Sequence, residues 1–204
     1  MDKVRIGFVG LGARGRGLLN DIVLQNPKAQ VTAVCDVYSD RTEEGAKLVE
    51  EKSGVKPFAS GDYRDIVTRD DVDAVVIASA WESHIPIAIA ALEAGKKVGM
   101  EVGGAYTVEQ CFELVKCVER TGVPLMLLEN CCYGRCELMV RNMVELGVLG
   151  EVVHCAGGYM HDLREEVAFG KERRHYRLRN YINRNCENYP THELGPIAKV
   201  LGIN

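Results

Sequence analysis

The 204-residue sequence predicts an α/β fold built on a doubly wound parallel sheet. Short apolar runs alternate with segments of helix length through the first 130 residues, which is typical of βαβ units. The run at residues 74–78 is apolar throughout, as expected of a strand that is covered on both faces. A glycine-rich turn also stands between the first apolar run and the first amphipathic segment.

The elements follow in order along the chain. Strands are predicted at residues 4–9, 31–35, 74–77, 97–100 and 124–128, with a short extended piece at 55–59. Helices are predicted at residues 14–24, 41–52, 85–94 and from Thr107 to Gly122. Thr107 and Gln110 form a capping box, while Gly95 and Gly122 are of the type favoured just after a helix end.

The regular alternation of strands and helices ends after residue 128. A helix is predicted near residues 137–146, followed by an extended run at 152–159 and a basic, polar segment at 161–188. We therefore predict two domains, residues 1–130 and residues 131–204. So few residues beyond the first domain bury little surface, and they would form a poor core by themselves.

Composition excludes several functional classes. The 25 basic and 29 acidic residues give a net charge of −4, which is unfavourable for neutralising nucleic-acid phosphates. Hydrophobic residues make up 47% of the chain, yet no uncharged run reaches the roughly 18 residues of a membrane helix. The first residues lack the long apolar stretch of a secretory signal. We expect a cytoplasmic protein without nucleic-acid or membrane partners.

Eight cysteines are many for this length. Without a secretory signal, reduced thiols are expected. The cluster of Cys131, Cys132 and Cys136 lacks the paired C-x-x-C or Cys–His spacing of zinc sites. No metal site is therefore predicted.

The glycine-rich turn reads G-x-G-x-x-G, with Gly10, Gly12 and Gly15 at its fixed positions. Such glycines allow a tight turn, close approach of a pyrophosphate and close helix packing in the Rossmann type of sheet. Asp36 ends the next predicted strand, where a carboxylate binds the adenosine ribose and repels a 2′-phosphate. The pattern predicts NAD binding. Arg41 would cover the adenine or be a solvated charge at a helix start.

Ligands of open α/β sheets lie beyond the carboxyl ends of the strands. One predicted strand is followed by Trp81, Glu82, Ser83 and His84, in a loop expected near the nicotinamide. The alternative is a tryptophan packed on a helix start, with His84 as a first-turn polar group. The next two strands end at Glu101 with Val102 and at Glu129 with Asn130.

A second unusual segment contains Tyr189, Pro190, Thr191 and His192. Tyr189 and His192 are three residues apart and would share a face in a helical turn. Histidine beside a tyrosine hydroxyl is competent for proton transfer. A capped helix start with a buried, hydrogen-bonded histidine is the alternative. Pro196 is expected to disturb a longer helix.

These motifs together resemble the Gfo/Idh/MocA group of sugar oxidoreductases, and within it the NAD-dependent glycosidases typified by α-N-acetylgalactosaminidase. The resemblance rests on the glycine loop with Asp36, on residues 81–84, on Glu101-Val102 and on the segment 189–192. It also includes residues 128–130, 133–135 and 158–159, and Arg177. Dehydrogenases of the group carry Lys after the glutamate and Asp four residues before the histidine. Val102 and Asn188 stand there instead.

The resemblance implies specific roles. The adenosine end of NAD would be held by Arg14, Gly15 and Asp36. The nicotinamide ribose would be surrounded by Trp81, Glu82, Ser83, His84, Glu101, Val102 and Asn130. The sugar would be faced by Tyr159, Arg177, Tyr189, Pro190, Thr191 and His192.

The resemblance also implies a reaction. The sugar would be oxidised at C3, lose its C2 proton and the group on C1, add water and be reduced again. His192 would be the base at the C3 hydroxyl, Tyr189 or Tyr159 would serve the C2 proton or water step, and Glu129 would orient the nicotinamide end. A simple NAD-dependent sugar dehydrogenase and a non-catalytic NAD-binding protein are the alternatives.

Members of the group continue with an open antiparallel sheet that forms the substrate domain and the oligomer face. The resemblance therefore implies that residues 131–204 are the beginning of an incomplete α+β substrate domain, in a chain that is either truncated or completed by a partner chain. It also implies assembly as a homo-oligomer.

Overall fold

The structure is a computed structural model, and it describes residues 3–203. It divides into two compact units, residues 1–128 and residues 129–204. Glu129 and Asn130, which the sequence analysis placed at the end of the first domain, fall in the second unit. Each unit is described by itself.

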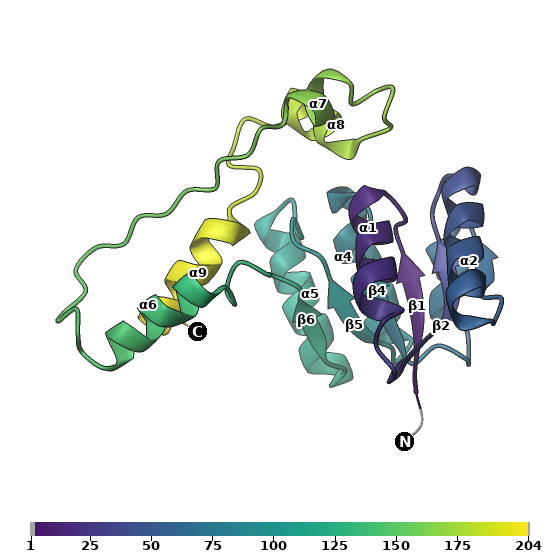
Figure 1. Cartoon of the computed structure of the whole chain (residues 1–204), viewed down its shortest axis with the longest axis horizontal. Helices are drawn as coiled ribbons and strands as arrows, with labels where there is room; N and C mark the ends of the chain where they lie inside the picture. Colours follow the sequence, from purple (N-terminus) through teal and green to yellow (C-terminus); the bar gives the residue numbers. More distant parts are fainter. Residues whose placement is uncertain (1–2, 204) are drawn as a thin grey trace. The chain divides into compact units, whose positions relative to one another are not determined.

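The first unit contains a parallel six-stranded sheet in the order β3-β2-β1-β4-β5-β6 (Figure 1). Its strands are β1 (Val4–Val9), β2 (Ala29–Cys35), β3 (Phe58–Ser60), β4 (Ala74–Ile77), β5 (Lys97–Met100) and β6 (Leu125–Leu127). The chain winds outward from β1 in one direction and from β4 in the other. This order confirms the predicted doubly wound, Rossmann-type fold.

Helices cover both faces of this sheet. One apolar core includes Phe8 and Val76 with side chains from α1 (Ala13–Leu18), the π-helical turn η1 (Leu19–Val23) and α2 (Ser39–Ser53). The other includes Val9 and Ile77 with side chains from α3 (Tyr63–Val67), α4 (Trp81–Glu93) and α5 (Val108–Thr121). Neighbouring residues of one strand enter opposite cores because successive side chains point to opposite faces.

Hydrogen bonds set the ends of these helices. The Thr107 hydroxyl accepts the Gln110 N–H at 3.2 Å, and Gly122 closes α5 in the left-handed region, as the sequence predicts. The predicted start of α4 at residue 85 is wrong, because the helix already begins at Trp81. The Ser83 N–H and hydroxyl both donate to the Ala80 carbonyl and close the first turn.

The second unit is helical in the part that the structure describes. Its helices are α6 (Arg135–Glu145), α7 (Arg164–Ala168), α8 (Tyr176–Asn183) and α9 (Thr191–Leu201), of which α6 and α9 lie side by side (Figure 1). Residues 152–159 pair with no strand among residues 129–203, so the β part of the expected α+β domain does not form here.

Pro196 lies inside α9 and does not end it, contrary to expectation. A proline at this position removes only one helical hydrogen bond, to the His192 carbonyl four residues before it. A search of residues 3–203 finds no helix long and apolar enough to cross a membrane.

Candidate functional site

The glycine loop joins β1 to α1 as the sequence predicts. A side chain at Gly10, whose φ is +99°, would lie 2.4 Å from the Ser79 backbone nitrogen. A Cβ at Gly15 would lie 1.9 Å from the Gly10 carbonyl oxygen, so α1 can pack on the loop only with glycine there. A Cβ at Gly12 would meet only the Arg41 guanidinium, at 3.6 Å. The loop is therefore packed against backbone at Gly10 and Gly15, whereas there is free space beside Gly12.

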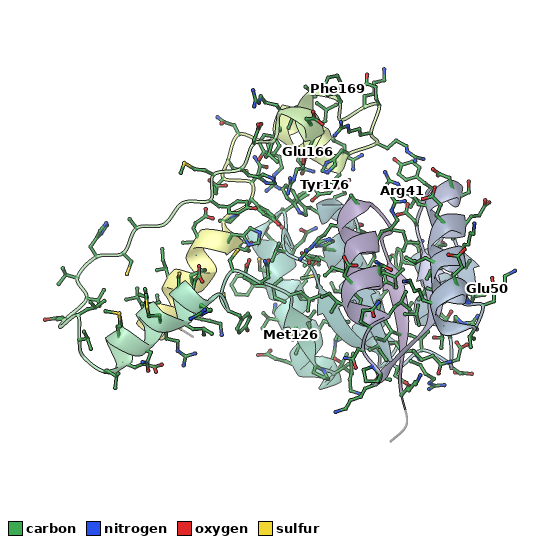
Figure 2. The ribbon with its side chains drawn as sticks, in the orientation of Figure 1. Arg41, Glu50, Met126, Glu166, Phe169 and Tyr176 are labelled. Atoms are coloured by element: carbon green, nitrogen blue, oxygen red, sulfur yellow. The ribbon has the colours of Figure 1, made fainter. Side chains whose placement is uncertain are left out.

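Asp36 lies at the end of β2 and is buried. Its Oδ2 accepts the Leu11 N–H at 2.7 Å, and its Oδ1 accepts the Tyr38 N–H at 3.0 Å. Each carboxylate oxygen keeps a further lone pair, so the group is oriented without being saturated. The Arg41 guanidinium, labelled in Figure 2, lies 4.7 Å from the centre of the Tyr38 ring.

Two residues expected at different parts of the cofactor contact each other in the first unit. The Arg14 guanidinium donates to Oε1 of Glu101 from Nε at 3.0 Å and from Nη2 at 2.8 Å. The Glu101 side chain is 8% exposed and that of Arg14 is 58% exposed. The pair joins the first turn of α1 to the carboxyl end of β5.

Trp81 is buried at the start of α4 rather than in a loop. A Cβ at Gly103, whose φ is +105°, would lie 2.0 Å from the indole Cδ1 of Trp81. The indole therefore packs directly on the backbone that follows Glu101 and Val102. Glu82 accepts the Tyr106 hydroxyl at 3.2 Å, and the Ser83 hydroxyl lies 2.8 Å from that of Ser79.

His84 lies in the first turn of α4 and is 1% exposed. Burial lowers its pKa, although a hydrogen bond with the Ser79 carbonyl and the nearby Glu101 act in the opposite direction. Its Nε2 donates to the Ser79 carbonyl at 3.0 Å when the ring is neutral. The ring thus ties the end of β4 to α4.

The second unit contains a buried carboxylate–imidazole pair. Nδ1 of His192 lies 2.7 Å from Oε1 of Glu129, and both side chains are less than 10% exposed. The same oxygen accepts the Cys131 N–H at 2.7 Å. Gly195, one turn after His192, permits this approach, because a Cβ there would lie 2.8 Å from Cys132 Sγ.

Aromatic rings surround His192. The ring centres of Tyr189 and Tyr159 lie 4.5 and 4.6 Å from that of His192, each with its edge toward a face. The Arg177 guanidinium lies 5.3 Å from the centre of the Tyr189 ring. The structure therefore brings together four of the six residues that the resemblance placed at the sugar.

The remaining predicted residues of this unit differ in their surroundings. Pro190 caps α9, and Thr191 is its first residue, with a buried hydroxyl that has no hydrogen-bond partner among the described residues. Tyr189 precedes the helix, so its contact with His192 comes from the turn rather than from a shared helical face. Asn130 is exposed.

Sequence reasoning missed the partners that hold the site residues. Ser79, Tyr106, Gly103 and Gly195 each contact a predicted residue across a turn or between elements. It also missed that a carboxylate oxygen of Glu129, Cys131 Sγ and a ring nitrogen of His192 all lie within 4.8 Å of one another. The sequence signal for Gly195 was a glycine three residues after His192, inside a helical segment.

Residues 4–128, more than half of the chain, match the oxidoreductase family Gfo/Idh/MocA with its NAD-binding Rossmann fold. The chain belongs to this family. Residues 133–204 match the C-terminal domain of glycosyl hydrolase 109. Both matches agree with the resemblance drawn from the sequence.

The chain spans about half the length of the curated relatives that it matches. A glycosyl hydrolase family 109 protein of Shewanella sp. (strain ANA-3) is 41% identical over the whole chain, which spans only 46% of that relative's length. The structure of scyllo-inositol dehydrogenase from Lactobacillus casei with bound NAD(H) and scyllo-inositol covers 98% of the chain and is itself covered to 57%, with a TM-score of 0.75 and 19% identity. The second likeness shows the fold alone.

Proposed function

We propose that this chain carries the NAD site and the proton-transfer residues of a glycosidase that oxidises its sugar transiently at C3. Elimination of the group on C1, addition of water to the resulting unsaturated ketone and re-reduction at C3 complete the reaction. The observation that carries the proposal is the buried Glu129–His192 pair with two tyrosine rings against it. The family membership and the glycosyl hydrolase 109 match support it.

The first unit fits NAD. The open position at Gly12 leaves room for a pyrophosphate against the backbone N–H groups at the start of α1. The oriented Asp36 carboxylate has lone pairs left for ribose hydroxyls. Bound there, NAD supplies a reversible acceptor for the hydride from C3.

Glu129 determines which nitrogen of His192 can act as base. An ionised carboxylate only accepts hydrogen bonds, so the Nδ1 facing it carries the proton of the neutral ring. Nε2 then holds the free lone pair. We assign Nε2 as the group that takes the proton from the C3 hydroxyl, with Glu129 stabilising the imidazolium that results.

The two tyrosines serve the later steps. Oxidation at C3 acidifies the C2 proton, and a phenol beside His192 is placed to exchange that proton or to position water. The Arg177 guanidinium lies over the Tyr189 ring, and this cation–π contact holds the ring in place beside His192. We assign sugar binding to these residues together with Pro190 and Thr191.

Uptake of deuterium from the solvent distinguishes this reaction from ordinary glycoside hydrolysis. An aryl glycoside with a free C3 hydroxyl is incubated in D2O with NAD and a stoichiometric amount of protein. We expect the released sugar to carry deuterium at C2 and the absorbance at 340 nm to show no net NADH. Both follow because the C2 proton is exchanged and the hydride is returned.

The alternatives give different products. Net NADH without release of the phenol would indicate a simple sugar dehydrogenase. Release of the phenol without deuterium at C2 would contradict the elimination route. The His192→Gln variant replaces the imidazole with an amide of similar size, and it should lose deuterium exchange at C2 but retain NAD binding. NAD binding is measured by the fluorescence of Trp81, the one tryptophan of the chain.

A further inference from the structure

Three side chains of the second unit, two from its start and one from α9, present an unusual combination of ligand atoms. Glu129, Cys131 and His192 offer one oxygen, one sulfur and one nitrogen, all within 4.8 Å of one another. Glu129 and His192 are buried, and Cys131 is half-buried. Carboxylate, thiolate and imidazole are the three protein groups that bind zinc.

A second observation in this cluster is an unsatisfied atom. Oε1 of Glu129 accepts two hydrogen bonds, from the Cys131 N–H and from His192. Oε2 of the same carboxylate is buried and has no partner among the described residues. Leaving a buried charged oxygen unpaired is costly, so a cation that ligates Oε2 would relieve that cost.

We propose that Glu129, Cys131 and His192 form a binding site for a thiophilic divalent cation of the Zn²⁺ class. The ion binds Oε2 of Glu129, Sγ of Cys131 and Nδ1 of His192, and a water molecule takes the fourth tetrahedral position. The carboxylate and the thiolate neutralise its two positive charges, and the thiol proton passes to solvent. Because a thiolate is a soft ligand, Mg²⁺ and Ca²⁺ are not accepted.

Occupation of this site blocks His192 as a base. A ring that ligates through Nδ1 carries its proton on Nε2 and has no lone pair left to accept another. Zn²⁺ therefore inhibits the proton transfer at C3. This consequence rests on the proposed function, whereas the binding itself does not.

Cobalt spectroscopy tests the binding on the whole chain. Reduced, metal-free protein is titrated with Co²⁺, whose visible bands report tetrahedral coordination and whose near-ultraviolet band reports a thiolate ligand. We expect both bands to saturate at one equivalent and to disappear when Zn²⁺ is added. Mg²⁺ should not displace Co²⁺.

Two cysteine variants localise the ion. Cys131→Ser should lose the near-ultraviolet band and weaken Zn²⁺ binding by more than the roughly 10–100-fold that loss of an outer partner causes. Cys136→Ser is the matched control, because Cys136 is exposed and lies outside the cluster. It should bind Co²⁺ and Zn²⁺ unchanged.

The folding of both variants is checked by urea unfolding and by NAD binding. Absence of stoichiometric Co²⁺ binding would overturn the proposal. So would a thiolate band that persists in Cys131→Ser or that disappears in Cys136→Ser. Zn²⁺ binding without inhibition would leave the site standing and contradict His192 as the base.

Discussion

At the scale of single residues, Asp36 carries the most defined role in the first unit. Its carboxylate accepts two backbone N–H groups, so it both orders the turn after β1 and fixes its own direction. We expect Asp36→Ala to weaken NAD binding by about 1–3 kcal/mol, because the ribose hydroxyls and both N–H groups lose their acceptor. Calorimetric titration with NAD measures this loss.

The charge of Asp36 makes a separate prediction about NADP. The wild-type chain should bind NAD more tightly than NADP, because the carboxylate repels a 2′-phosphate. Asp36→Asn keeps the shape and one acceptor oxygen but removes the charge, so it should narrow the difference between the two cofactors. Equal binding of both cofactors by the wild-type chain would contradict this role.

Residue identities could be predicted from sequence where a backbone requirement selects one residue type. Gly10, Gly15 and Asp36 are of this kind, because the turn and the strand end demand them. Their partners could not be predicted. The Arg14–Glu101 and Glu129–His192 pairs join positions 87 and 63 residues apart, and only the folded chain brings them together.

At the scale of elements, α1 offers a matched pair of glycines. A Cβ at Gly15 would lie 1.9 Å from the Gly10 carbonyl oxygen, whereas a Cβ at Gly17 would meet nothing within 4 Å. Gly15→Ala should therefore lower the free energy of unfolding by about 3 kcal/mol and abolish NAD binding, because the loop must move. Gly17→Ala should raise it by roughly 0.5–1 kcal/mol through higher helix propensity.

Urea unfolding and NAD titration of both variants measure these effects. Because the two substitutions are chemically identical and lie in one helix, any difference between them comes from the contact with the loop. Equal effects would show that α1 does not rest on Gly10.

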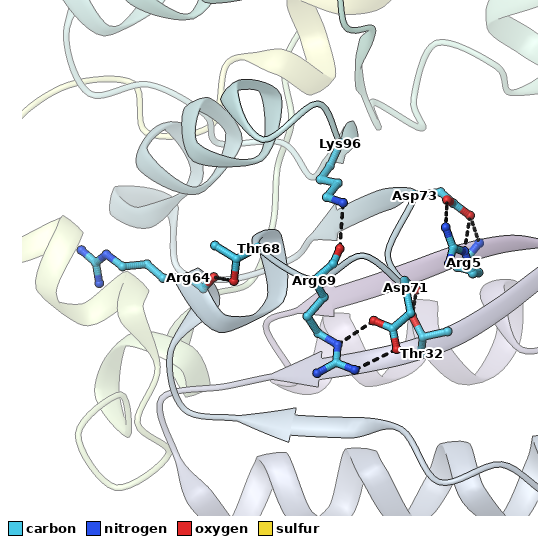
Figure 3. Close-up of polar contacts among 8 residues, drawn as sticks. All are labelled: Arg5, Thr32, Arg64, Thr68, Arg69, Asp71, Asp73 and Lys96. Atoms are coloured by element: carbon cyan, nitrogen blue, oxygen red, sulfur yellow. Dashed lines mark hydrogen bonds and ion pairs between the residues drawn. The ribbon is translucent and has the colours of Figure 1, made fainter.

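The amino ends of β1 and β4 are joined by a charged pair. Oδ2 of Asp73 accepts hydrogen bonds from the backbone N–H and from the Nε–H of Arg5. Oδ1 of Asp73 accepts a third hydrogen bond, from Nη2 of Arg5 at 2.6 Å (Figure 3). These bonds lower the pKa of Asp73 from 3.8 to about 2. A carboxyl whose pKa is lowered by folding stabilises the fold above pH 3.8, and this contribution is lost as the pH falls toward 2.

Replacing Asp73 tests that dependence. Asp73→Asn should reduce the urea midpoint at pH 6 and have a much smaller effect near pH 2, where the carboxyl of the folded wild-type chain is about half protonated. High salt should diminish the difference at pH 6, since the pair is partly exposed. A difference independent of pH would assign the effect to packing instead.

Strand positions in the first unit followed from sequence because burial on both faces requires continuous apolar runs, as at residues 74–77. The start of α4 did not follow, since it depends on the hydroxyl and carbonyl contacts of Ser79, Ala80 and Ser83. The second unit was the least predictable. Its segment at residues 152–159 has strand-like composition but no neighbouring strand among residues 129–203.

At the scale of the whole molecule, the two units differ in how much apolar surface they bury. Among the described residues, Cys132 is the one buried apolar residue of the second unit, and no apolar side chain of α6, α7 or α9 is buried. Val153 and Met160 are 89% and 99% exposed. The first unit holds two apolar cores, and its edge strand β6 exposes the neighbouring side chains Met126, which Figure 2 labels, and Leu127.

This difference predicts that the 204-residue chain binds NAD but turns over glycosides poorly. Catalytic groups must be held within about half an ångström of their productive positions. Loss of this precise positioning lowers the rate roughly 100-fold or more. Tyr159, Tyr189 and His192 belong to a unit that has no apolar core of its own. The glycine loop and Asp36 belong to the unit that has two apolar cores.

A chimera checks this directly, in which the remaining residues of the Shewanella relative follow residue 204. We expect the chimera to gain at least about 100-fold in kcat/KM for an aryl glycoside while its Kd for NAD stays within about twofold. Amide hydrogen exchange should slow in α6 and α9 but not in the sheet, because only the second unit gains buried surface. In the chimera, His192→Ala should abolish turnover and leave NAD binding unchanged. If the 204-residue chain already matches the chimera in rate, the second unit is ordered without a core and this explanation is wrong.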